Sequence, residues 1–69
     1  MTPRMIRQIW ELIEETQSSM LLNLDDNSLV TWIVSEVDST HPLNHQETDT
    51  YSHYVRSRLP LIRDVVDAR

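Results

Sequence analysis

The chain contains no glycine among its 69 residues. Two-residue β-hairpins need residues that adopt positive φ angles, and phosphate-binding loops need a backbone that a ligand can approach without a Cβ in the way. Tight hairpins and phosphate-binding loops therefore lack the glycine that they usually contain. This disfavours a β-meander, a P-loop and a dinucleotide-binding loop. The sequence favours an all-α fold whose helices are joined by turns rich in Asn, Asp and Pro.

Length and the absence of cysteine limit how such a chain is stabilised. A domain of about 60 residues buries only about 60% of the surface that its unfolded chain exposes. Without cysteine there is no disulfide and no thiolate metal site, so we expect one domain, residues 1–69, held by helix packing or association. No long apolar segment predicts a leader or a membrane span, and we expect a soluble cytoplasmic protein.

The first predicted helix begins at Pro3, after Thr2 as N-cap, because a proline in the first turn lacks only an N–H that would have no partner there. It ends near Leu22 or Asn23, with Asn23 as a left-handed C-cap. Its apolar stripe recurs at helical spacing. The stripe comprises Ile6, Ile9, Ile13, Thr16 and Met20.

A second predicted helix follows a turn in which Asp25 or Asp26 accepts hydrogen bonds from the first backbone N–H groups. β-Branched residues make a strand conceivable here, but such a strand has no partner, and the apolar residues share a helical face. These residues are Leu29, Val30, Ile33, Val34 and Val37.

Pro42 ends this helix and Asn44 starts the next, with Glu47 completing a capping box. Pro60 then either kinks the third helix or begins a fourth. The tail is amphipathic, with Leu59, Ile62 and Val66 on one face and Leu61 and Val65 beside them, and should dock on the core. The predicted fold class is all-α, a compact bundle of three helices plus a short C-terminal helix.

The net charge of −5 conceals a segregation along the chain. Arginines occur only in residues 1–10 and 51–69, whereas residues 11–50 contain nine acids and no Arg or Lys. A solvated, soluble surface is the simplest interpretation. The alternative is that the C-terminal arginines lie over the acidic flank of the first helix, within one chain or across a dimer, because guanidinium pairs bidentately with carboxylates.

Metal binding and catalysis find little support. His45, Asp49 and His53 recur every four residues, a spacing that suits zinc ligands on a helix, and they are the only metal candidates, although the general-base glutamate of an HExxH helix is missing. Solvent-exposed histidines are the favoured interpretation. Ser52 and His53 face different directions as helical neighbours, so we expect no enzyme and no cofactor.

A protein–protein interaction module, or small adaptor, remains the favoured function. A second copy of the chain is one candidate partner, and no membrane partner is expected. Nucleic acid is an unfavoured partner, because the third helix presents acids and only the Arg-rich C-terminal segment has a suitable charge. Aromatic and arginine side chains dominate protein interfaces, and the predicted contact residues are Trp32, Tyr51, Tyr54, Arg56, Arg58 and Arg63.

Three segments together resemble a small cyanobacterial protein family of uncharacterised function. They are residues 3–10 (Pro-Arg-Met-Ile-Arg-Gln-Ile-Trp), residues 21–32 with Leu-Leu-Asn-Leu-Asp-Asp followed by Ser-Leu-Val-Thr-Trp, and residues 54–64 (Tyr-Val-Arg-Ser-Arg-Leu-Pro-Leu-Ile-Arg-Asp). The resemblance extends over nearly the whole chain. It implies a free-standing cytoplasmic helical protein and assigns no catalytic, metal-binding or cofactor-binding residue.

Overall fold

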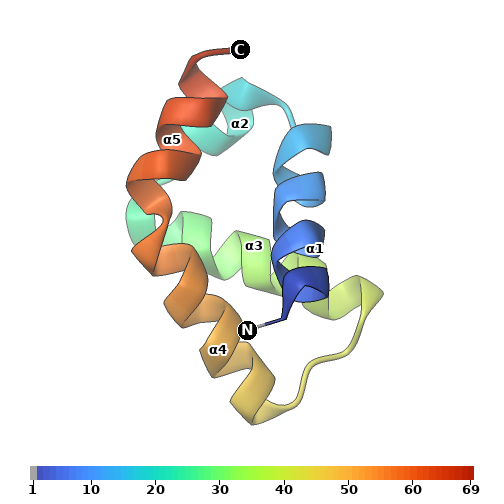
Figure 1. Ribbon diagram of the computed structural model, residues 1–69. Coiled ribbons are helices and arrows are strands. Elements are labelled where there is room, and N and C mark those ends of the chain that lie inside the picture. The colour runs from blue at the N-terminus through green and yellow to red at the C-terminus, as the bar shows by residue number, and fades with distance from the viewer. Residues whose placement is uncertain (1) are drawn as a thin grey trace.

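The computed structural model describes residues 2–69, and that range folds into five α-helices. They are α1 (Pro3–Glu15), α2 (Ser18–Leu22), α3 (Asp26–Thr40), α4 (His45–Ser57) and α5 (Leu59–Asp67). Helix α3 packs against both α1 and α4, and α5 packs against α2 and α4. In Figure 1, α1 and α5 stand on opposite sides of the molecule, with α3 running behind them.

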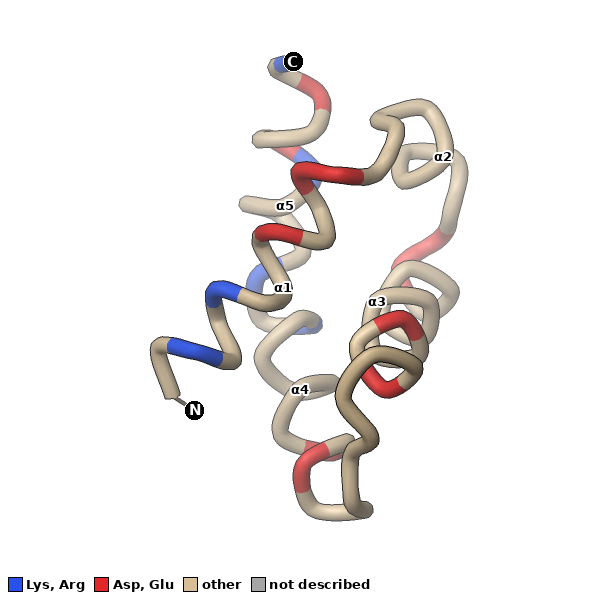
Figure 2. Tube along the Cα trace, turned by 90° about the vertical axis from the view of Figure 1, so that its right-hand side faces the viewer, with Lys and Arg blue, Asp and Glu red and all other residues tan. Residues whose placement is uncertain are grey.

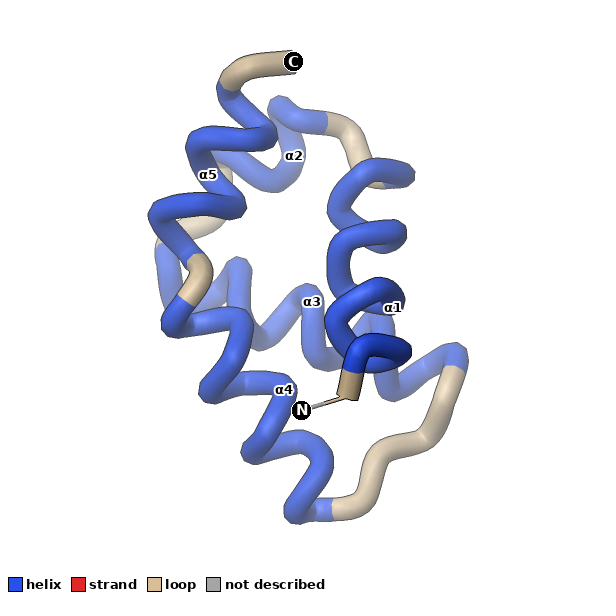
Figure 3. Tube along the Cα trace, in the orientation of Figure 1, coloured by secondary structure: helices blue, strands red, loops and turns tan. Residues whose placement is uncertain are grey.

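One hydrophobic core joins all five helices. It comprises Ile9, Ile13, Leu21, Leu29, Val30, Ile33, Val34, Val37, Tyr51, Val55, Leu59, Ile62 and Val66. The Cα radius of gyration is 11.2 Å, close to the roughly 11 Å expected of a compact chain of this length. The all-α class is therefore confirmed, and Figure 3 shows helices joined by short loops. No helix within residues 2–69 is long and apolar enough to cross a membrane.

The predicted starts of three helices are confirmed by their capping hydrogen bonds. The Thr2 hydroxyl accepts from the Met5 N–H at 3.3 Å, and Asp25 accepts from the Ser28 N–H at 2.8 Å. Asn44 and Glu47 form the expected capping box. The Asp25 bond also lowers the pKa of that carboxyl below its ordinary value, because the backbone N–H of Ser28 stabilises the charged form. Local side chains thus fix where these helices begin.

The prediction of one long first helix is wrong, because the chain leaves the helical conformation at Thr16 and Gln17 and restarts as α2. Thr16 is extended, and its hydroxyl donates to the Leu12 carbonyl at 2.7 Å, closing α1. The break redirects the chain so that Leu21 is buried, whereas Met20 of the predicted stripe is only half-buried. It also accounts for five helices where three plus a short C-terminal one were expected.

The turns at Asn23 and Pro60 test the two other predictions about helix ends. Asn23 does cap α2, but with φ −80° and ψ −11°, so the predicted left-handed conformation is wrong. No residue in the range 2–69 has a positive φ, as suits a chain without glycine. A separate helix, α5, begins at Leu59 with Pro60 in its first turn, so Pro60 accompanies a new start and not a kink. Leu59, Ile62 and Val66 face the core, as predicted.

Candidate functional site

Two of the predicted contact arginines hold the molecule together internally. The Arg63 guanidinium donates to one carboxylate oxygen of Asp26 at 2.8 and 3.2 Å and to the Leu24 carbonyl at 2.9 Å. Arg56 donates to the side-chain oxygen of Asn27 at 3.0 Å. Both therefore tie the C-terminal helices to the start of α3. Some of their N–H donors are engaged in hydrogen bonds within the chain, so fewer donors are available to a partner.

A third arginine, at the end of the chain, closes α1. Arg69 donates to the backbone carbonyls of Ile13, Glu14 and Thr16 at 2.5, 3.3 and 3.1 Å. The last carbonyls of a helix have no partner within it, and cationic side chains stabilise that end. The structure thus brings a C-terminal arginine to the first helix within one chain. It binds carbonyl oxygens there, whereas the charge segregation had pointed to the carboxylates.

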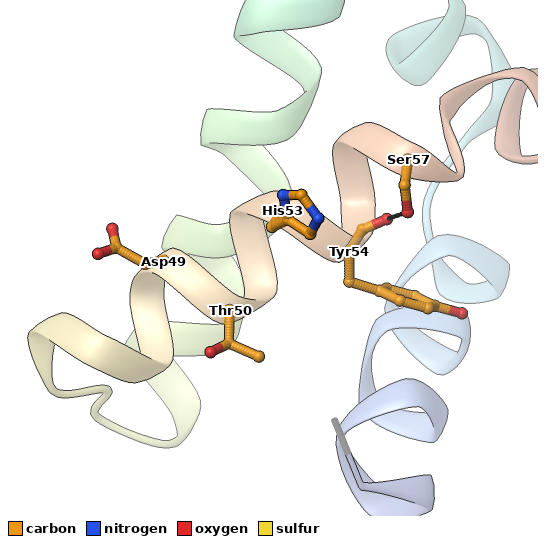
Figure 4. Close-up of a pocket in the computed structure, with 5 residues that line it drawn as sticks. All are labelled: Asp49, Thr50, His53, Tyr54 and Ser57. Atoms are coloured by element: carbon orange, nitrogen blue, oxygen red, sulfur yellow. Dashed lines mark hydrogen bonds between the residues drawn. The ribbon is translucent and has the colours of Figure 1, made fainter.

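Tyr54 and Arg58 lie together beside α1. The Trp10 indole N–H donates to the Tyr54 hydroxyl at 3.3 Å, and the Arg58 guanidinium carbon lies 5.4 Å from the centre of the Tyr54 ring. That distance is within the range of a cation–π contact. Figure 4 shows the Tyr54 ring pointing from α4 toward α1. Of the predicted contact residues, these two form a cluster, and Trp10 joins it.

Tyr51 belongs to the core and leaves the set of candidate contact residues. Its side chain is 2% exposed, and its hydroxyl donates to the Gln8 side-chain oxygen at 2.6 Å. Burial raises the pKa of Tyr51 above its ordinary value, and the Glu47 carboxylate adds to the rise. Trp32 is half-buried and packs against the core, so only its outer part is accessible.

Two apolar side chains on α5 are exposed instead. Leu61 is 49% exposed and Val65 is 39% exposed. Leu61 and Val65 are four residues apart and lie on one side of α5, and Arg58, the cap residue just before the helix, is three residues before Leu61. This side begins at the Tyr54–Arg58 contact and runs toward Arg69, which reaches α1 again. We refer to Tyr54, Arg58, Leu61 and Val65 as the α5 face.

Leu61 and Val65 flank the buried stripe of α5 and were not among the predicted contact residues. The signal was present, because a five-residue apolar set on a nine-residue helix is wider than one buried stripe needs. Trp10 was not among the predicted contact residues. Its hydrogen bond to a side chain 44 positions away follows from the packing of α1 near α4, which no local pattern encodes.

The predicted metal residues do not converge. His45 and Asp49 pair at 3.5 Å, with side chains 95% and 71% exposed, and His53 lies one turn further along α4. Asp49, Thr50, His53, Tyr54 and Ser57 line an open groove of about 410 Å³ on α4 (Figure 4). Within residues 2–69 no group of three or more His, Asp or Glu side chains is arranged to hold a metal ion.

Comparisons with known proteins add no relative. No family model matches the chain, and no curated protein or solved structure is similar to it. The resemblance to the small cyanobacterial family stays a prediction. Function must therefore be argued from the surface of this molecule.

Proposed function

We propose that the protein is a non-enzymatic interaction module, or small adaptor, that binds a protein partner through the α5 face. The observation that carries the proposal is the exposure of Leu61 and Val65, at 49% and 39%, on one side of a helix whose other side is buried in the core. Leu59, Ile62 and Val66 are the residues that anchor α5 in the core. The exposed pair is therefore not needed to hold the helix in place.

The neighbours of this pair suit an interface. Tyr and Arg are enriched among residues that dominate binding energy, and here Tyr54 and Arg58 are already held against one another. A side chain that is fixed before binding loses less conformational entropy on binding. The hydrogen bond from Trp10 to the Tyr54 hydroxyl fixes the ring further. The α5 face thus combines apolar anchors with an aromatic and a cationic side chain on rigid elements.

The geometry suggests how a partner engages it. Residues 58, 61 and 65 follow the spacing i, i+3 and i+7. Proteins that bind a helix in an apolar groove recognise side chains at this spacing. We therefore expect the partner to supply a groove with an apolar floor for Leu61 and Val65. An acidic group at its edge would meet Arg58.

The test compares a double variant, L61D/V65D, with a matched control, T31D/S35D. The control places the same two new charges at the same spacing on exposed positions of α3. Proteins captured from the source cells by the wild-type chain are identified, and the affinity of the purified partner is then measured for each variant. We expect at least about 30-fold weaker binding for L61D/V65D, the loss typical of two or more kcal/mol at a dominant contact.

Circular dichroism is used to check that both variants keep the helical content of the wild type. The control should bind as the wild type does. If L61D/V65D binds the captured partner as tightly as the control, the α5 face is not the binding surface and the proposal fails.

A further inference from the structure

Helix α1 distributes its charges against the helix dipole. Arg4 and Arg7 lie near its N-terminus, while Glu11, Glu14 and Glu15 lie toward its C-terminus, as the blue and red segments of α1 in Figure 2 show. Anionic residues are favourable at a helix N-terminus and cationic residues at its C-terminus. The arrangement in α1 is the reverse of both preferences. This arrangement of charges therefore weakens the isolated helix. A contact with another molecule, in which the charges find partners, would explain it.

In the part of the chain that the structure describes, these charges form no ion pair. Among residues 2–69 the ion pairs are Arg63–Asp26 and His45–Asp49, and neither involves α1. The four C-terminal arginines contact Asn27, Tyr54, Asp26 and the end of α1, as described above. Arg4 and Arg7 are exposed and form no such contact within the described residues.

The acidic half of α1 borders a groove toward α3. Glu11 and Glu15 line it from α1, and Glu36 lines it from α3. Leu12 and Val37 contribute apolar surface to the same groove, whose volume is about 240 Å³. An arginine suits this combination, because its aliphatic stem covers apolar surface while the guanidinium pairs with carboxylates.

We propose that two copies of the chain associate through α1, with the helices antiparallel, so that Arg4 and Arg7 of each copy enter the acidic groove of the other. The proposal is independent of the α5 face, because it uses neither Leu61 nor Val65.

The spacing of the charges supports the antiparallel arrangement. Arg4, Arg7, Glu11 and Glu15 are three, four and four residues apart, so they lie along one exposed side of α1. When the helix is paired with its own reversed copy about a two-fold axis near its middle, Arg4 comes opposite Glu15 and Arg7 opposite Glu11. Each contact then occurs twice, as two-fold symmetry requires. The two helix dipoles are also antiparallel, which is favourable.

The test uses two charge-reversed variants, R4E/R7E and E11R/E15R. Alone, each variant places like charges opposite one another in the antiparallel pair and should remain a monomer of 8.2 kDa. In an equimolar mixture, one copy of each variant restores every opposite-charge contact. The control D64R/D67R changes the net charge as E11R/E15R does, but on exposed positions of α5. Sedimentation equilibrium over a range of concentrations measures the average mass.

For the wild type we expect a mass that rises toward twice 8.2 kDa with concentration at about 50 mM salt, and that falls back at about 1 M salt, where the Debye length shrinks to about 3 Å. The control D64R/D67R and the α5 variant L61D/V65D should behave as the wild type does. The 1:1 mixture should associate at least as strongly as the wild type.

Misfolding would not mimic this result. Each α1 variant removes charges that oppose the helix dipole but places like charges three and four residues apart, so circular dichroism and thermal melting check that each variant is folded before its mass is compared, and only a folded pair can associate again on mixing. A wild type that stays monomeric at low salt, single variants that associate like the wild type, or a mixture that stays monomeric would each overturn the proposal.

Discussion

Replacing Ile62 with alanine should destabilise the protein far more than the same replacement of its neighbour Leu61. Ile62 is 0% exposed, whereas Leu61 is 49% exposed. The change Ile62→Ala deletes a methyl and an ethyl group from the core. At about 0.8 kcal/mol for each buried carbon group, the lost transfer free energy is about 2.4 kcal/mol. The cavity that remains brings the expected cost to about 2–5 kcal/mol.

That cost is large for this chain. Typical stabilities of about 0.05–0.15 kcal/mol per residue imply roughly 3–10 kcal/mol for the whole domain. The melting temperature should therefore fall by at least about 10 °C. Ile62→Val keeps most of the side chain and should cost about 1 kcal/mol. Leu61→Ala should change the free energy of unfolding by no more than about 0.5 kcal/mol.

Urea denaturation followed by circular dichroism at 222 nm, the usual helix signal, measures all three variants. The comparison of adjacent residues tests which side of α5 faces the core. If Leu61→Ala is as destabilising as Ile62→Ala, α5 is rotated from the orientation described above, and the α5 face does not exist as an exposed surface.

Further outcomes follow from the contacts of three residues. Tyr51→Phe removes the hydrogen bond to Gln8 and should cost about 1 kcal/mol in urea denaturation at neutral pH. Because the folded state raises the pKa of Tyr51 above 10.0, the wild-type free energy of unfolding should fall as pH rises past that value, and Tyr51→Phe should flatten this fall. The pKa of Asp25 is lowered from 3.8, so the stability that its carboxylate contributes should be present above pH 3.8 and be lost as the pH falls below that value. At neutral pH, Asp25→Ala should therefore melt at a lower temperature than the wild type. In acid, the melting temperature of the variant should depend less on pH than that of the wild type. Arg69→Ala removes the bonds to the end of α1 and should lower stability by about 1 kcal/mol, with an unchanged melting temperature arguing that those carbonyls are satisfied without it.

Several features could be predicted from local sequence because their cause is local. The N-caps at Thr2 and Asp25 and the capping box at Asn44 depend on a side chain reaching a backbone N–H three residues away. The buried faces of α3 and α5 follow from apolar spacing, since a regular helix turns its i, i+3 and i+4 residues to one side. The candidate arginines and Tyr54 were found by residue type.

The roles of those candidates could not be predicted in the same way. The positions of Arg56 and Arg63 opposite Asn27 and Asp26, about 30 or more residues away in the chain, depend on how α4 and α5 return to the start of α3. Tyr51 and Tyr54 differ by three residues and have similar chemistry, yet one is buried and the other is half-exposed. The difference comes from how α4 packs against the rest of the molecule, α3 above all, which the local sequence does not encode.

The absence of glycine favoured an all-α chain, and the spacing of apolar and capping residues indicated where most helices begin and what they bury. Tertiary structure decided the break at Thr16, because Arg69 binds the last carbonyls of α1 and the redirected chain buries Leu21 of α2 in the core. It also decided which arginines form hydrogen bonds within the molecule and which do not. Local rules act over a few residues, whereas these outcomes depend on contacts between segments that only the packed core brings together.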